Sequence, residues 1–177
     1  MDRRTVLLAD LDLKVTRGLE IGPLTAAVVS KEEGSVEYID HLSTEELRKK
    51  YSCEAAIDVN KIPLVDHVLD EGRLPRHLIG GNYDYIIASH VFEHLPNPLG
   101  WMRDCASILR PGGRLALVVP DKRFTFDYSR TLTTLAEWVG SDLLDQRRPS
   151  PRQIVEAATC SAHLEPGITW QRAPKPD

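Results

Sequence analysis

The chain has 177 residues, and 22 Lys or Arg against 26 Asp or Glu give it a net charge of −4 at neutral pH. Its 42% hydrophobic and 27% charged residues suit a globular protein of one domain, and the acidic balance argues against a protein that holds nucleic acid by charge. The apolar runs are too short for a membrane span or a signal segment, and three separated cysteines suggest neither a disulfide framework nor a thiolate zinc site, so a soluble, cytoplasmic protein is expected.

The first half of the chain predicts two strands and a well-capped helix. Residues 3–16 are compatible with a short leading helix, and residues 17–23, RGLEIGP, form an apolar run closed by a Gly-Pro turn, as a strand would be. A second strand is predicted over residues 35–40, SVEYID, after a compact crossover of about two helical turns. Residues 43–51, STEELRKKY, have a capping Ser, an acidic first turn and a basic last turn, which predicts a helix.

The second half of the chain alternates strands and helices. Its clearest strand is YDYIIAS, residues 83–89, which is apolar on both faces as a strand covered on both sides should be. Pro98 opens a helix with apolar residues at helical spacing, and the Pro-Gly-Gly at 111–113 is expected to stop it. The other predicted elements are a weak strand at 64–69, a short helix or turn at 73–81, a strand at 114–120 and helices over 132–143 and 154–162.

Alternating strands and helices are typical of a mostly parallel sheet with helices on both faces. The predicted fold class is therefore α/β, a Rossmann-like doubly wound sheet. We expect one domain over residues 1–165 with its core at 17–127, followed by a Pro-containing tail at 166–177. Open sheets of this kind bind ligands at the carboxyl ends of their strands, near the point where the strand order reverses.

Polar residues gather at the predicted strand ends. Any chain has polar residues where a strand meets a loop, so each one taken singly is weak evidence, but the set together indicates a site. In chain order the residues are Glu20, Gly22, Pro23, Asp40, His41, Asp70, Ser89, His90, Glu93, His94 and the run Asp121–Arg123.

Asp40 has the spacing of an acid that binds the hydroxyls of a ribose. It ends the second predicted strand, 18 residues after Gly22, and a carboxylate about 20 residues beyond a glycine turn has this placement in nucleotide-binding sheets. Gly22 lets the backbone approach a ligand closely. The turn has one glycine and no P-loop lysine, which disfavours a nucleoside triphosphate. A ligand with adenosine but no pyrophosphate fits better.

Four segments carry a family resemblance: LEIGP, VEYIDH, YDYIIASHVFEHLPNP and LRPGGRLALVVPD. In this order and spacing the chain resembles the class I S-adenosylmethionine-dependent methyltransferases of the small-molecule type, over about residues 17–127. The resemblance implies the cofactor S-adenosylmethionine and a small-molecule acceptor, for which a saccharide or related metabolite is our expectation. The sequence departs from the family pattern at Leu24, where another glycine is usual.

The resemblance also implies roles for individual residues. Glu20, Gly22 and Pro23 lie in the motif that meets the amino-acid part of the cofactor. Asp40, followed by His41, matches the acid that binds the ribose, and Asp70 matches the acid on the adenine side. Ser89 and His90 match the strand end that faces the sulfonium and the acceptor.

Methyl transfer needs few catalytic groups, because the leaving sulfide needs no proton and the protein mainly aligns the reactants and excludes water. A base helps only when the acceptor is a hydroxyl or another protonated nucleophile, and an imidazole suits that task. By position His90 and His94 are the candidates, with the alternative that one or both merely hold the loop through backbone hydrogen bonds.

Two other functions compete with this interpretation. His90, Glu93 and His94 spell the H-x-x-E-H zinc motif, which needs a stable helix that Pro96 and Pro98 leave little room for. The second alternative is a non-catalytic or truncated module, because the family fold normally ends in a β-hairpin and the chain after residue 119 shows helical periodicity, with ITW at 168–170 too short to replace the hairpin. An uncovered sheet edge predicts self-association or a partner that covers it.

Overall fold

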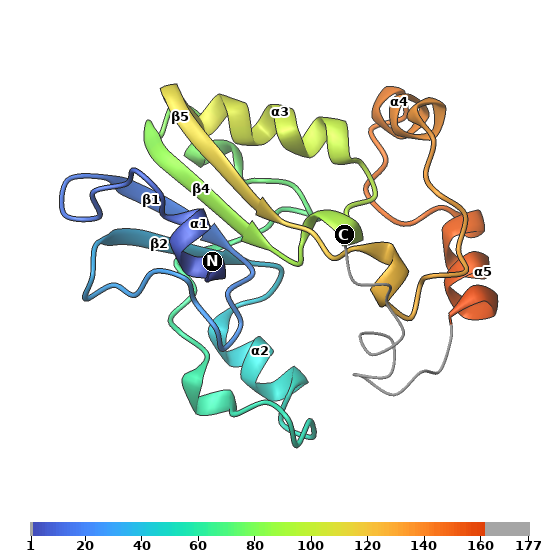
Figure 1. Ribbon diagram of the computed structural model, residues 1–177, viewed down its shortest axis with the longest axis horizontal. Helices are drawn as coiled ribbons and strands as arrows, with labels where there is room; N and C mark the ends of the chain where they lie inside the picture. Colours follow the sequence, from blue (N-terminus) through green and yellow to red (C-terminus); the bar gives the residue numbers. More distant parts are fainter. Residues whose placement is uncertain (1, 162–177) are drawn as a thin grey trace, which may run out of the picture.

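The computed structural model describes residues 2–161, which form one open parallel sheet with helices around it (Figure 1). Within these residues five strands lie in the order β3-β2-β1-β4-β5, and every neighbouring pair is parallel. The order reverses between β1 and β4, which places the switch point there. The predicted Rossmann-like α/β class is confirmed. The strands are β1 Arg17–Ile21, β2 Ser35–Asp40, β3 His67–Val68, β4 Tyr83–Ser89 and β5 Leu109–Val118.

Most helices begin where local side-chain signals predict. The α-helices are α1 Arg3–Leu7, α2 Thr44–Lys50, α3 Pro98–Ile108, α4 Leu135–Leu143 and α5 Pro151–Cys160. Helices α2, α4 and α5 each start with a full capping box, in which the cap hydroxyl and the side chain three residues on satisfy each other's backbone amides. The cap at Ser150 explains why α5 starts three residues before the predicted Ile154.

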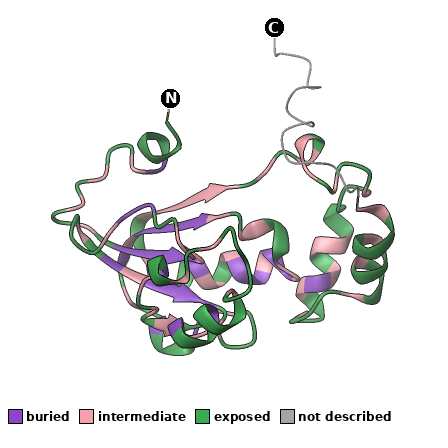
Figure 2. Cartoon of the chain, turned by 90° about the horizontal axis from the view of Figure 1, so that it is seen from below, coloured by how far each residue is buried: buried purple, intermediate pink, exposed green. Residues whose placement is uncertain are grey.

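The sheet is covered on both faces. Alternate residues of β4 point to opposite sides, so Ile86 packs with Trp101 of α3 while Tyr85 packs with Leu7 of α1. The burial is concentrated in the central strands and α3, whereas α4 and α5 are mostly exposed (Figure 2). No helix among residues 2–161 is long and apolar enough to cross a membrane.

The crossover from β1 to β2 differs from the expected two helical turns. Residues 22–34 form turns instead of a helix. The cause is a competing acceptor: the amides of Val28 and Val29 donate to the carboxylate of Glu20, at 2.8 and 3.2 Å, and so are unavailable to helical carbonyls. Leu7 of α1 packs against this crossover and covers the sheet there.

Two strands also differ from their predicted bounds. The strand expected at 64–69 is reduced to His67–Val68, because this edge strand pairs only with the last two residues of β2. Strand β5 starts at Leu109, before the predicted residue 114, because Leu109 already pairs with Tyr83. The next residue of β4 to pair is Tyr85, with Arg114, so the Pro-Gly-Gly segment between forms an irregularity in the strand, with Gly112 at a positive φ of 78°.

Strand β5 is the outer strand on its side of the sheet. Among residues 2–161 no strand pairs with its free edge, and Leu115 to Val118 stay half-exposed. The chain instead turns away into α4, where Trp138 meets Phe92 edge to face at 5.8 Å and Asp142 pairs with Arg103 of α3. The ITW segment, residues 168–170, lies outside the described residues.

Candidate functional site

The carboxyl ends of β1, β2 and β4 meet at the switch point. Ile21 of β1 lies opposite Ile39 of β2 and Ala88 of β4, so the residues that follow these three positions share one edge of the sheet. The structure therefore brings together Gly22, Asp40 and Ser89, as the sequence predicts.

Glu20 points into the protein and holds the crossover. Its side chain is fully buried, and its two carboxylate oxygens accept the Val28 and Val29 amides. Burial raises the pKa of Glu20 above its ordinary value, while the two amide bonds and the charge of Arg3 pull the pKa down. Glu20 thus shapes the loop behind Gly22, and each of its carboxylate oxygens accepts one amide of that loop.

The turn after β1 has a left-handed backbone. Gly22 has φ of +65°, and a Cβ there would lie 3.1 Å from Cγ2 of Val91, in the loop after β4. Pro23 is buried. Leu24, where the family usually has glycine, adopts φ of +45°, a conformation that costs a non-glycine residue energy. The loop therefore has the left-handed backbone that favours glycine, although residue 24 is a leucine.

Asp40 is a buried carboxylate of the site, and it contacts His41, which in turn contacts Lys50. Its Oδ1 accepts the His41 amide at 2.7 Å and lies 2.5 Å from the His41 Nδ1. The His41 Nε2 in turn lies 2.9 Å from the Lys50 Nζ at the end of α2. Among residues 2–161 no hydrogen bond uses the Asp40 Oδ2. One carboxylate oxygen thus remains for a ligand.

Asp70 stands in an exposed turn at the end of the β3 segment. Its backbone pairs with that of Arg73 through two hydrogen bonds of 2.9 Å, while the preceding Leu69 amide donates to the Asp40 carbonyl. This places Asp70 beyond β3, on the side of the sheet where an adenine-side acid is expected. It also lines a cavity of about 180 Å³ with Arg73 and Arg76.

The segment after β4 carries both candidate bases. His90 has φ of +56°, and the chain then makes a single 3₁₀ turn at Phe92–His94. The carboxylate of Glu93 lies between the imidazoles, 3.4 Å from the His90 Nδ1 and 4.0 Å from the His94 Nε2. Both imidazoles are exposed to solvent.

This geometry does not support the zinc alternative. The H-x-x-E-H motif needs a continuous helix that presents both histidines on one face, and the 3₁₀ turn is too short for that. Among residues 2–161 no group of three His, Cys, Asp or Glu side chains is arranged to hold a metal ion.

Arg3 is a site residue that the sequence did not reveal. Its Nη1 donates to the Ser89 Oγ at 3.4 Å, so α1 brings a guanidinium to the end of β4. The two residues are 86 positions apart, and no local pattern links them. The contact places a positive charge at the switch point, next to the glycine turn.

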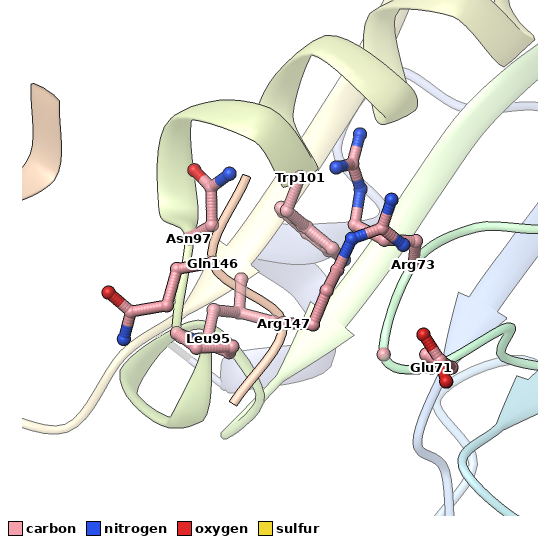
Figure 3. Close-up of a pocket in the computed structure, with 9 residues that line it drawn as sticks. Glu71, Arg73, Leu95, Asn97, Trp101, Gln146 and Arg147 are labelled. Carbon is pink, nitrogen blue, oxygen red and sulfur yellow. The ribbon is translucent and has the colours of Figure 1, made fainter. Parts of the chain in front are cut away.

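A small cavity lies between residues 71–73, residues 95–97 with Trp101, and residues 146–147. Residues 146–147, which follow α4, close over it, and Figure 3 shows Arg147 reaching toward Arg73 and Trp101. Its volume of about 10 Å³ fits a single water molecule. Neither this cavity nor the one lined by Asp70 includes Gly22, Asp40 or Ser89. Both cavities therefore lie outside the strand-end site.

Comparisons with known proteins point to one family. Residues 3–158 match the model described as a methyltransferase domain. A ubiquinone biosynthesis O-methyltransferase of Xanthomonas campestris pv. campestris is 46% identical over 37 residues, 21% of this chain and 16% of that protein. The Vibrio parahaemolyticus protein of the same name is 27% identical over 84 residues, 40% of this chain and 36% of its own. The chain thus matches well under two thirds of either relative.

Among solved structures, a SAM-dependent methyltransferase from Aquifex aeolicus is 16% identical, with a TM-score of 0.46 and 82% of each chain covered. Another SAM-dependent methyltransferase, from Mesorhizobium loti, is 14% identical, with a TM-score of 0.48 over 86% of this chain and 76% of that one.

Proposed function

Because the chain belongs to the methyltransferase domain family, we propose that it transfers a methyl group from S-adenosylmethionine to an oxygen of a small molecule. The family model confirms the resemblance that the four sequence segments suggest. One observation carries the proposal: the buried carboxylate of Asp40 stands across from Gly22 at the switch point with its Oδ2 unbonded among residues 2–161.

The residues at the strand ends fit the parts of S-adenosylmethionine. Asp40 offers an acceptor for the ribose, and the Gly22 turn lets the backbone approach the ligand without a side chain in the way. Arg3 supplies a cation for the carboxylate of the amino-acid part. The bound cofactor supplies an activated methyl group on a sulfonium.

His90 and His94 are the candidate bases for a hydroxyl acceptor. The Glu93 carboxylate lies 3.4 Å from the His90 Nδ1 and 4.0 Å from the His94 Nε2. Both are exposed at the carboxyl end of β4, where an acceptor can approach from solvent. An oxygen acceptor also agrees with the names of the two curated relatives, and the hydroxyl of a saccharide or of a phenol satisfies the same chemistry.

Calorimetric titration with S-adenosylhomocysteine tests the proposal. Wild type is expected to bind, and Asp40→Ala to bind at least about tenfold more weakly, because a hydrogen bond to a charged group contributes about 1.5–3 kcal/mol. His77→Ala is the control, since this exposed histidine contacts the ring of His67 and makes no hydrogen bond to Gly22, Asp40 or Ser89 among residues 2–161. Equal affinity of wild type and Asp40→Ala, or no binding by either, would remove the main support.

A second candidate is a module that binds the cofactor without turnover. It is favoured by the free edge of β5, since no strand among residues 2–161 completes the sheet there. Transfer of labelled methyl from S-adenosylmethionine to a panel of phenols and sugars separates the two. Binding of S-adenosylhomocysteine without any transfer supports the module, and transfer to any of these acceptors excludes it.

A further inference from the structure

We infer that His41 is a positioning residue that fixes the orientation of the Asp40 carboxylate. As a result, the site binds one of the two ribose hydroxyls more strongly than the other. The inference rests on the proposed function and concerns the specificity of the same site. Its basis is the chain of contacts from Asp40 through His41 to Lys50.

The Lys50 ammonium determines which nitrogen of His41 carries the proton. An ammonium only donates, so the Nε2 at 2.9 Å from the Lys50 Nζ must accept. The neutral ring then has its proton on Nδ1, which donates to the Asp40 Oδ1 at 2.5 Å. Lys50 thus favours the His41 tautomer whose Nδ1 proton is donated to the Asp40 carboxylate.

His41 holds the orientation of the Asp40 carboxylate through the contact of its Nδ1 with Oδ1. The Asp40 backbone pairs with Val68 of β3, and its carbonyl accepts the Leu69 amide at 2.8 Å. The Asp40 side chain is 7% exposed and that of His41 46%, so the carboxylate sits inside while the imidazole stands at the rim. The half-exposed imidazole therefore holds the buried carboxylate from the solvent side.

The contact with His41 leaves the two Asp40 oxygens with different numbers of free acceptor positions. Oδ1 already accepts two hydrogen bonds, from the backbone amide and the ring of His41, which fills the lone-pair positions of that oxygen. Oδ2 accepts none from residues 2–161. A ribose that placed one hydroxyl on each oxygen would have to displace His41. We therefore expect one hydroxyl to bind Oδ2 strongly and the other to gain little from Asp40.

The test compares S-adenosylhomocysteine with its 2′-deoxy and 3′-deoxy analogues by calorimetry. For wild type, loss of one hydroxyl should weaken binding by about tenfold or more, and loss of the other by less than about twofold. In His41→Ala the ring donor is gone, so the two penalties should become similar. His41→Asn, which keeps a side-chain N–H donor, should retain the inequality, and the matched control His77→Ala should behave as wild type.

Each outcome decides one question. Equal penalties in wild type, or the same inequality in His41→Ala, would overturn the role of His41 while leaving the proposed function intact. Failure of wild type to bind S-adenosylhomocysteine at all would refute the proposed function, and the inference with it. If His41→Ala does not fold, as judged by its melting curve, the Lys50→Met variant replaces it, because removal of the ammonium frees Nε2 and should also narrow the inequality.

Discussion

The centre of the sheet and the C-terminal helices are held together in different ways. In the centre, Leu19, Ile39 and Ile86 are fully buried and packed by helices or loops on both faces. Helix α5 has no buried residue, and Leu135 and Leu143 of α4 are 72% and 82% exposed. Capping boxes and surface ion pairs, such as Arg103 with Asp142, stabilise α4 and α5 instead.

This difference shows which part of the molecule sets the geometry of the site. In a close-packed apolar core, adding or removing a single methyl group shifts the neighbouring side chains. Exposed ion pairs, in contrast, contribute little to stability and are screened by salt. Gly22, Asp40 and Ser89 all extend from the packed strands. We therefore expect substitutions in the centre to alter stability and ligand binding together, and substitutions in α4 to alter neither strongly.

The largest expected effect is at Gly18 of β1. A Cβ there would lie 2.0 Å from Cζ of the buried Tyr85 ring, so Gly18→Val should lower the free energy of unfolding by about 3 kcal/mol or more. In α4 the matched glycine is Gly140, where an added Cβ would have no atom within 4 Å. Gly140→Ala should therefore raise the free energy of unfolding by up to about 1 kcal/mol. Urea unfolding measures both. Similar effects at the two glycines would contradict the contrast between the regions.

The next largest effect is at Glu20. Glu20→Ala leaves the buried Val28 and Val29 amides without acceptors, at about 1–3 kcal/mol each, and should release the crossover. Hydrogen exchange should therefore speed up at both amides. Glu20→Gln keeps one acceptor oxygen and serves as the milder comparison. Unchanged exchange at Val28 and Val29 in Glu20→Ala would show that the crossover is held by other contacts.

Glu20 also predicts a pH dependence. Burial raises the pKa of Glu20 in the folded state, so the folded chain holds this proton more tightly than the unfolded chain does. The contribution of Glu20 to stability is then complete below its ordinary pKa and falls as the pH rises through the raised value. The difference in stability between wild type and Glu20→Gln should decrease over that range in urea titrations. A difference that grows with pH would contradict the direction of the shift.

A smaller gain is expected at Leu24. Its φ of +45° is costly for leucine and natural for glycine, so Leu24→Gly should stabilise the protein by about 1 kcal/mol. Leu24→Ala keeps the unfavourable backbone and loses side-chain contacts, so it should not stabilise. Thermal melting compares the three proteins, and a destabilised Leu24→Gly would mean that the leucine side chain contributes more than the backbone costs.

The smallest effect is expected in α4. Arg103 pairs with Asp142 at 2.5 Å and is mostly exposed, so Arg103→Ala should lower the melting temperature slightly at low salt and not at all in high salt. Binding of S-adenosylhomocysteine should stay as in wild type. A large loss of stability that persists in high salt would mean that α4 supports the sheet.

The sequence predicted those features that short stretches of chain determine. Apolar runs located β1, β2 and β4, and the Ser43 capping signal located α2. The position of Asp40 followed from the strand it ends. These features depend on neighbours within a few residues, so their physical cause is visible in the sequence.

Features that depend on distant residues could not be predicted. The crossover forms no helix because the Val28 amide donates to the Glu20 carboxylate. Strand β3 is short because it pairs only with the last two residues of β2. The contact of Arg3 with Ser89 joins segments with no common pattern. The link from His41 to Lys50 becomes visible only once α2 has a position relative to β2.

The capping boxes of α2, α4 and α5 have a consequence for the order of folding. Each helix start is specified within four residues, so these turns can form within about a microsecond as the chain collapses. The register of Gly18 with Tyr85, in contrast, needs a long loop to close and comes late. The strand-end site at the switch point should therefore be among the last parts of the molecule to assemble, after the helices have begun to form.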